Sequence, residues 1–428
     1  MLTYELRKMT VDKLNEVMTR QGVDLTDAIE KVRPIVESVR AGGDKKLVEL
    51  ACSLDGFRGG PLTVPGEEIR SARTRIPEEL YRALTLAKKR IERFHSKQVL
   101  KPFEFRDDCC TLGQKVVPLE RVGIYVPGGT ADYMSTVLMA CVPARIAGVD
   151  EIAICTPGRS GRVPDAILAS AGLCGVTEIH AVGGAHSIAA MAYGTESIPR
   201  VQKIVGPGGA FVTAAKLLVR NDCEIDFLAG PSEILVIADA RADPQMIASD
   251  MLAQLEHDPL ARAILVTNSS KVADKVSREL DLQLAKAARS EIASKAVEKG
   301  AVCIITRSIS ESVGFANSYA PEHLLLDVTE PERILEDVRN AGSVFLGRYS
   351  SVAFGDYCSG TNHILPTKGV ASMRSSLSVY DFFKIIPYQS ISEAGAARLS
   401  KIVNVLARSE GLPAHAEAAS IRARRMSK

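Results

Sequence analysis

The 428-residue chain lacks several features that would assign a protein to a class at once. No apolar run approaches the ~20 residues needed to cross a bilayer, and the first residues lack the apolar core of a signal peptide. The 53 basic and 51 acidic residues nearly balance, so no charge excess favours nucleic acid or an anionic membrane as a partner. We therefore expect a cytoplasmic protein that binds neither.

Paired cysteines are also missing. The nine cysteines are scattered, odd in number and form no C-x-x-C pair, which suits a reduced compartment better than a disulfide framework. Histidine is scarcer still, at seven residues, and four of these lie near acidic or amide side chains in the C-terminal half. Nitrogen and oxygen donors of this kind serve both zinc and proton transfer, so we interpret the chain as a metalloenzyme.

A chain of this length exceeds the size at which one core usually stops growing, so we expect at least two domains. Short β-branched runs alternate with amphipathic segments, which is typical of βαβ units and parallel sheets. The expected strands form a first series, 122–126, 151–155, 178–182 and 202–205, and a second, 233–238, 263–267, 301–306, 324–328 and 343–346. The fold class is therefore α/β, with two incomplete Rossmann-like domains of similar architecture and small helical segments at both ends.

Glycines follow several expected strands, in Gly128-Gly129, Gly183-Gly184 and 206–209. Such turns line the crevice where open α/β sheets bind ligands, and glycine lets the backbone approach a phosphate. Ordinary tight turns explain any single pair as well. The fingerprint G-x-G-x-x-G is absent because Phe211 stands where the third glycine would be. The pattern permits a nucleotide without requiring one.

Gln254 and His257 lie near the end of an expected helix. Asp243 and Pro244 favour its start, and Asp258-Pro259 stops it. Side chains three residues apart project from one helix face, where two donors can hold one ion. The alternative is a histidine that is hydrogen-bonded at a helix C-terminus, which suits an imidazolium.

Glu322 and His323 lie between Pro321, which ends the preceding helix, and the strand at 324–328. Their side chains have unperturbed pKa values near ~4.3 and ~6.5, so either could take a proton from an alcohol or a water. The alternative is a polar loop at the mouth of a strand.

Two further polar groups complete the candidates. The segment 354–363, with Asp356 and His363, is dense in glycine and polar residues, and such a loop favours a functional role over packing. Glu410 and His415 flank Pro413, which breaks any single helix and lets the two side chains converge. Solvated surface loops are the alternative for both.

Seven separated motifs resemble those of histidinol dehydrogenases, in the order found in that family. They lie at 120–129, 229–233, 254–259, 319–323, 355–363, 376–382 and 410–415. The resemblance runs from about residue 119 to the C-terminus, and the N-terminal region is compatible by length and helical pattern.

This resemblance implies a homodimer that oxidises L-histidinol to L-histidinal and then to L-histidine, reducing two NAD in the last steps of histidine biosynthesis. It implies one zinc per subunit, with Gln254, His257, Asp356 and His415 as ligands. The tail with Glu410 and His415 would come from the partner subunit.

The resemblance also implies the domain boundaries. Residues 25–125 and 234–376 would form a discontinuous α/β domain that carries the zinc and catalytic site, and 126–233 an inserted dinucleotide-binding domain. Residues 1–24 would form an N-terminal helical segment, and 377–428 a helical tail exchanged between subunits.

The roles of single residues follow from the same resemblance. His323 would take the alcohol proton, and Glu322 would activate water for the aldehyde step. The substrate would contact Ser232, Gln254, His257, His323, Asp356, His363, Glu410 and His415, and the dinucleotide would contact Tyr125, His186 and Gly209. The family usually has glutamine at 186 and asparagine at 209. Losing the amide at Gly209 removes a hydrogen bond worth roughly 0.5–1.5 kcal/mol, so NAD would bind more weakly or differently.

Other chemistries stay open at this point. A thiol such as Cys358 could form an oxidisable thiohemiacetal in the aldehyde step, although no neighbour marks a lowered pKa. A relative could oxidise another small alcohol, such as a sulfonated diol. A zinc hydrolase would use Glu322 as its base, and a silent binding protein would be expected to lose Glu322 or His323.

Overall fold

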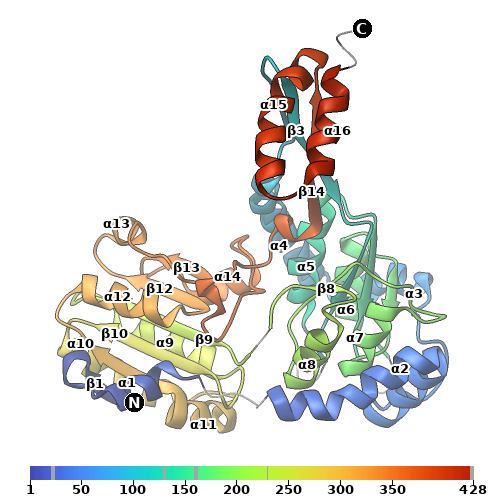
Figure 1. Cartoon of the computed structure of the whole chain (residues 1–428). Helices are drawn as coiled ribbons and strands as arrows, with labels where there is room; N and C mark the ends of the chain where they lie inside the picture. The colour runs from blue at the N-terminus through green and yellow to red at the C-terminus, as the bar shows by residue number, and fades with distance from the viewer. Residues whose placement is uncertain (21–24, 129–131, 159–161, 229, 425–428) are drawn as a thin grey trace. The chain divides into compact units, whose positions relative to one another are not determined.

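The computed structural model describes residues 1–20, 25–128, 132–158, 162–228 and 230–424 (Figure 1). The chain divides into two compact units. The first unit comprises residues 1–98 and 120–381, and the second comprises 99–119 and 382–428. Among the described residues, no helix combines the length and apolar character that crossing a membrane requires.

One half of the first unit is built on a five-stranded parallel sheet of order β6-β5-β4-β7-β8. The strands are β4 (Arg121–Tyr125), β5 (Glu151–Cys155), β6 (Glu178–His180), β7 (Lys203–Val205) and β8 (Glu224–Ile225). The connecting helices are α5 (Met134–Ala147), α6 (Asp165–Leu173), α7 (Gly184–Tyr193) and α8 (Ala210–Val219). In chain order the strands run 3-2-1-4-5, which is the Rossmann order without its sixth strand.

The other half is built on a six-stranded parallel sheet of order β1-β11-β10-β9-β12-β13. The strands are β1 (Leu2–Glu5), β9 (Glu233–Ala238), β10 (Arg262–Thr267), β11 (Ala301–Ile305), β12 (His323–Asp327) and β13 (Ser343–Leu346). The helices are α9 (Pro244–Leu255), α10 (Ser270–Leu284), α11 (Ser290–Gly300), α12 (Ile309–Tyr319), α13 (Pro331–Leu335) and α14 (Val352–Tyr357). Without β1, this sheet repeats the order 3-2-1-4-5.

Local sequence explains these elements. Strands β9 and β10 are buried along their whole length, as expected of parallel strands that helices cover on both faces. Helix α9 begins where predicted, because the Asp243 carboxylate accepts hydrogen bonds from the backbone N–H groups of Gln245 and Met246. Helix α10 buries Val272, Val276 and Leu280, which lie four residues apart on one face.

The N-terminal helices are α1 (Val11–Met18), α2 (Leu25–Leu54), α3 (Gly66–Ser71) and α4 (Glu78–His95). Helix α2 packs against α7 and α8, and α4 packs against α5. The buried side chains of α2, including Val32, Val36 and Leu47, belong to the core of the five-stranded sheet. The packing therefore joins this part of the segment 25–125 to the five-stranded sheet, and not to the six-stranded sheet as the expected boundaries had it.

The second unit has an antiparallel sheet of order β14-β3-β2 and a helical hairpin. The strands are β2 (Phe103–Arg106), β3 (Cys110–Pro118) and β14 (Phe383–Ile391), and the helices are α15 (Glu393–Ser409) and α16 (Pro413–Arg424). The two helices pack against each other, as Figure 1 shows in red. Gly411 takes a positive φ of 74° at the turn between them.

The prediction of two similar parallel α/β sheets is confirmed, and all nine expected strands lie within two residues of their expected bounds. The two terminal segments are less uniformly helical than expected. Residues 2–5 form strand β1, and residues 383–391 form strand β14. Strand β14 pairs with β3 across more than 260 residues of sequence, and Pro387 stands in its middle. The local sequence pattern predicts a strand neither at residues 2–5 nor at residues 383–391.

Candidate functional site

A pocket of about 390 Å³ lies in the first unit. The five-stranded half contributes residues that follow strands, such as Pro127 after β4 and Gly208-Gly209 after β7. The six-stranded half contributes residues at or before the starts of strands, namely Ser232 before β9 and the pair Glu322 and His323 at β12. The carboxyl edge of one parallel sheet and the amino edge of the other therefore line one cavity.

Three of the four expected zinc ligands line this pocket, namely Gln254, His257 and Asp356. Gln254 is buried in the last turn of α9, which ends at Leu255, shortly before the expected stop at Asp258-Pro259. His257 follows the C-cap residue, and its backbone N–H donates to the carbonyl of Gln254 at 3.3 Å. Asp356 comes from α14, which lies far along the chain.

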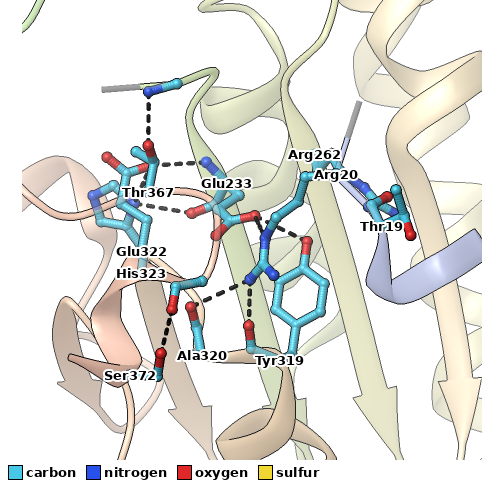
Figure 2. A network of polar contacts seen from close by, with 12 residues as sticks. Thr19, Arg20, Glu233, Arg262, Tyr319, Ala320, Glu322, His323, Thr367 and Ser372 are labelled. Atoms are coloured by element: carbon cyan, nitrogen blue, oxygen red, sulfur yellow. Dashed lines mark hydrogen bonds and ion pairs between the residues drawn. The ribbon is translucent and has the colours of Figure 1, made fainter. Parts of the chain in front are cut away.

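Glu322 and His323 are held by a single residue, Glu233, at the start of β9 (Figure 2). The backbone N–H of Glu233 donates to Oε2 of Glu322 at 2.8 Å. The backbone carbonyl of Glu233 lies 3.1 Å from Nδ1 of His323. A carbonyl can only accept, so Nδ1 carries the proton and neutral His323 has its lone pair on Nε2. Among the described residues Nε2 is buried without a hydrogen-bond partner, 3.6 Å from a carboxylate oxygen of Asp356.

The electrostatics of this pair favour proton exchange near neutrality. Burial raises the pKa of the Glu322 carboxyl to about 8. Burial opposes a charge on His323 as well, but the carboxylates of Glu322 and Asp356 outweigh it and raise the imidazole pKa to about 9. Glu322 and His323 lie 3.6 Å apart, so they titrate as a coupled pair. Groups with such pKa values suit general acid–base catalysis.

Three other titratable groups of the pocket suit ligand binding. Burial lowers the pKa values of His257 and His363, which favours neutral imidazoles with a free nitrogen lone pair. Burial works against the charge of Asp356, but the nearby imidazole groups, that of His323 first, outweigh it and lower the carboxyl pKa. His363 lies in the lining, with Nδ1 2.7 Å from the backbone carbonyl of Asp356 and Nε2 3.4 Å from the hydroxyl of Thr136.

The three residues expected to contact the dinucleotide have different positions. Gly209 lines the pocket as the N-cap of α8, and a Cβ atom there would meet nothing within 4 Å. Tyr125 and His186 are buried and are not among the lining residues. The Tyr125 hydroxyl accepts a hydrogen bond from the backbone N–H of Gly184, and His186 Nε2 lies 3.0 Å from a carboxylate oxygen of Asp55.

Glu410 and His415 belong to the second unit, whereas all the described residues that line the pocket belong to the first. Glu410 is the C-cap of α15, and His415 lies in the first turn of α16. Both side chains are exposed. In the part of the chain that the structure describes, no three His, Cys, Asp or Glu residues are grouped closely enough to hold a metal ion. Cys358, the alternative nucleophile, caps the C-terminus of α14 and is absent from the described pocket lining.

Sequence reasoning missed the side chains that support the pocket. Arg20 forms an ion pair with Glu233 at 2.8 Å, and Tyr319 donates a hydrogen bond to the same carboxylate oxygen. Asp55 was also missed, although its carboxylate holds both His186 and the backbone N–H of Gly183. The sequence contains one signal for the ion pair with Arg20. Glu233 is a charged residue at the start of a fully buried strand, where a charge needs a partner.

Comparisons with known proteins agree on one family. The family model described as histidinol dehydrogenase matches residues 18–423. A histidinol dehydrogenase of Methanosarcina barkeri is 44% identical over 98% of this chain and 97% of its own length. That of Methanothermobacter thermautotrophicus is 46% identical over 95% of this chain and 96% of its own. The crystal structure of histidinol dehydrogenase from Elizabethkingia anophelis superposes with a TM-score of 0.95, covering 100% of this chain and 99% of that one at 35% identity.

Proposed function

The chain belongs to the histidinol dehydrogenase family, and we propose that Glu322 and His323 are the proton-transfer pair with which it oxidises L-histidinol to L-histidinal and then to L-histidine. The reaction is NAD-dependent and belongs to histidine biosynthesis. The observation that carries the assignment is the geometry of the pair. The backbone N–H and carbonyl of Glu233 hold the two side chains, and Nε2 of His323 has no hydrogen-bond partner among the described residues.

His323 acts in the first oxidation. Its Nε2 atom accepts the hydroxyl proton of L-histidinol while the carbon releases a hydride to the nicotinamide. The Nδ1–H group keeps its hydrogen bond to the carbonyl of Glu233, so the ring need not turn to receive the proton. The products of this half-reaction are L-histidinal, NADH and one proton.

Glu322 acts in the second oxidation. Its carboxylate takes a proton from water as the water oxygen adds to the aldehyde carbon. His323, protonated in the first oxidation, returns its proton to the aldehyde oxygen, which gives the hydrate. The hydrate carbon then releases the second hydride to a second NAD while one hydroxyl proton passes to Nε2 of His323. The carboxylic acid that results loses its remaining proton and gives the carboxylate of L-histidine. Burial raises the pKa of Glu322 to about 8, which makes its carboxylate a stronger base than an ordinary carboxylate and places its ionisation at mildly alkaline pH.

The donors in the pocket suit a zinc ion. We assign Gln254, His257 and Asp356 of one subunit, with His415 of the partner subunit, as the groups that would hold it, since burial favours a neutral His257 and Asp356 keeps a lowered pKa. Bound zinc would supply a Lewis-acid anchor for the imidazole and amine of the substrate. Ser232 and His363, together with Glu410 of the partner subunit, would contact the remaining polar atoms of the substrate.

For NAD we propose the carboxyl edge of the five-stranded sheet. Gly209 offers an open backbone at the start of α8, where N–H groups suit a phosphate. Tyr125 and His186 would act indirectly, because their polar contacts hold the turn at Gly183-Gly184.

A homodimer follows from the same assignment. The second unit exposes many large apolar side chains, including Phe103, Phe105, Ile385, Ile386, Tyr388, Val405 and Leu406. Isolated exposed side chains are ordinary, but this number on one small unit suits a surface that a second copy covers. We also expect the protein to be cytoplasmic. Analytical ultracentrifugation tests the dimer, and a monomer at micromolar concentration would contradict it.

The central experiment measures NADH formation with L-histidinol, with and without a chelator. Two NADH should form per L-histidine, and the chelator should abolish the reaction until zinc is added back. The variant Glu322→Gln should lose the oxidation of L-histidinal more than that of L-histidinol. An equal loss of both half-reactions would remove Glu322 from the water step, and no NADH from L-histidinol would refute the assignment.

A further inference from the structure

A buried ion pair lies directly behind the catalytic residues and takes no part in the proposed proton transfers. Figure 2 shows Arg20 reaching Glu233 beside Tyr319. The side chains of Arg20 and Glu233 are only 13% and 2% exposed. Burying two charges is costly, and an apolar pair of similar volume often serves stability equally well. The position of this pair therefore calls for an explanation beyond stability.

Glu233 connects the ion pair to both catalytic side chains. Its N–H group holds the carboxylate of Glu322, and its carbonyl holds the Nδ1 atom of His323. The side chain of the same residue is fixed at Oε2, which accepts hydrogen bonds from Nε of Arg20 at 2.8 Å and from the hydroxyl of Tyr319 at 2.9 Å. Among the described residues Oε1 has no partner, so the anchoring of Glu233 depends on this one oxygen.

Arg20 holds the catalytic segment from a second side as well. Its terminal nitrogen donates to the backbone carbonyls of Tyr319 and Ala320, the latter at 3.2 Å. Ala320 takes a positive φ of 52°, a strained conformation for alanine, two residues before Glu322. The guanidinium group lies 3.8 Å from the centre of the Tyr319 ring, which adds a cation–π contact.

The backbone at the end of α1 is fixed in turn. Arg262, the first residue of β10, donates to the backbone carbonyl of Thr19 at 2.8 Å. The planar guanidinium of Arg20 thus joins three segments that are distant in sequence, around residues 20, 233 and 320. A lysine at position 20 could form the ion pair, but its single ammonium group could not donate to all these partners at once as a planar guanidinium does.

We propose that Arg20, Glu233 and Tyr319 are positioning residues that hold Glu322 and His323 in the orientation needed for both proton transfers. The proposal rests on the proposed function of that pair. Loosening the anchor should shift the backbone at Glu233 and release the 319–320 turn, which would misplace both bases. A displacement of about 1 Å at reacting groups can cost roughly 100-fold in rate.

The test uses the whole enzyme and the double variant Arg20→Met/Glu233→Gln, in which neither side chain is left as an unpaired buried charge. We expect its thermal unfolding midpoint to stay near that of the wild type, its kcat to fall at least 10-fold for both oxidations, and its KM values for L-histidinol and NAD to change less than threefold. The single variant Arg20→Met should be less stable than the double variant.

A matched control is the double variant Arg121→Met/Glu178→Gln. It removes another partly buried ion pair of the first unit, at the amino ends of β4 and β6, opposite the carboxyl ends whose following residues line the pocket. Arg121 also pairs with the exposed Glu151, which solvent can screen. Its kcat should stay within twofold of the wild type. If Arg20→Met/Glu233→Gln keeps kcat within twofold, or loses activity only through KM, the ion pair serves folding alone and the proposal is overturned.

A second readout does not require turnover. The chain has only seven histidines, so ¹⁵N-histidine labelling gives few ring signals, and the variant His323→Gln identifies that of His323. In spectra recorded at a pH above about 9, where the ring of His323 is neutral, we expect an Nδ1–H tautomer in the wild type and a mixture of tautomers in Arg20→Met/Glu233→Gln. If the tautomer of His323 in Arg20→Met/Glu233→Gln is the same as in the wild type, the positioning role is refuted. This readout does not depend on activity. Failure of the wild type to reduce NAD would instead refute the proposed function.

Discussion

Lys216 and Asp226 form a buried ion pair that holds the turn after β7. Lys216 donates to the backbone carbonyl of Gly206 at 2.6 Å and to Oδ1 of Asp226 at 2.6 Å. The backbone N–H of Gly206 donates to the other oxygen of Asp226 at 2.8 Å. The side chains of Lys216 and Asp226 are 3% and 1% exposed, so water does not screen the pair.

The variant Asp226→Asn keeps an acceptor for Gly206 but leaves the charge of Lys216 buried without its partner. Breaking a buried pair in this way costs ~3–5 kcal/mol. With a denaturant slope of about 3 kcal/mol per M, the urea midpoint of the transition that includes the five-stranded sheet should fall by about 1–1.7 M. The double variant Asp226→Asn/Lys216→Met should recover most of this loss, because no buried charge remains.

The same variant should affect one substrate only. Gly206 leads into Gly208-Gly209, which line the pocket, so a looser turn should raise the KM for NAD several-fold. The KM for L-histidinol should stay within twofold, because the Glu322–His323 pair is anchored in the other sheet. Urea unfolding followed by circular dichroism and steady-state kinetics measure the two effects. A urea midpoint shift below about 0.3 M, which is ~1 kcal/mol, would refute the reasoning about the buried charge.

Three further predictions follow from single positions. Gly209→Asn should lower the KM for NAD by about 2- to 12-fold, since the regained amide hydrogen bond is worth roughly 0.5–1.5 kcal/mol. The new side chain fits, because a Cβ atom at this position meets no atom within 4 Å. An unchanged KM would exclude a contact between residue 209 and NAD. Gly206→Ala should destabilise the protein by ~2 kcal/mol or more, measured by thermal unfolding, because φ is +118° and the new Cβ atom would lie 2.1 Å from the carbonyl oxygen of Tyr125; a stable variant would contradict this. Burial works against the charge of Glu178, but hydrogen bonds with His180 and Arg121 outweigh it and lower the carboxyl pKa. This group therefore adds stability above its unfolded pKa. The contribution disappears as the pH falls through the lower pKa of the folded state. Glu178→Gln should therefore flatten the acid limb of the stability profile, and an unchanged slope between about pH 5 and pH 3 would contradict the shift.

Much of the fold could be predicted because its signals are local. The strands of both parallel sheets are continuous apolar runs such as 233–238, and Asp243-Pro244 marks a helix start by its own chemistry. Strand β14 could not be found in this way, because it is almost fully exposed and its partner, β3, lies far away in sequence. The packing of α2 against α7 and α8 is likewise a tertiary fact, since an amphipathic helix does not reveal which core it covers.

The residues of the candidate site also fall into two groups, those with a local sequence signal and those that only long-range contacts bring together. The carboxylate–imidazole pair at 322–323 is adjacent in sequence and was therefore visible, and its pocket also contains Gln254, His257 and Asp356. The supporting pair Arg20 and Glu233 is separated by 213 residues, and no local pattern connects its members. The burial of His186 against Asp55 was hidden for the same reason. Side chains that hold a site depend on long-range contacts more than the side chains that react.

The two sheets share one strand order but present opposite edges to the pocket, and this difference has an electrostatic meaning. At the carboxyl edge of the five-stranded sheet, α8 begins at Gly209 and offers the positive end of its dipole, which suits the phosphates of a dinucleotide. At the amino edge of the six-stranded sheet, α9 ends beside Gln254 and His257 and offers its negative end, which suits a metal cation or an imidazolium. The usual location of ligands at carboxyl ends of parallel strands thus holds for the first sheet and is reversed for the second. The reversal is already visible in the sequence, because Ser232 and Glu322 directly precede strands, whereas the glycines at 206–209 follow one. Two copies of one topology that face a cavity with opposite edges therefore offer it helix ends of opposite polarity, one suited to an anionic ligand and one to a cation.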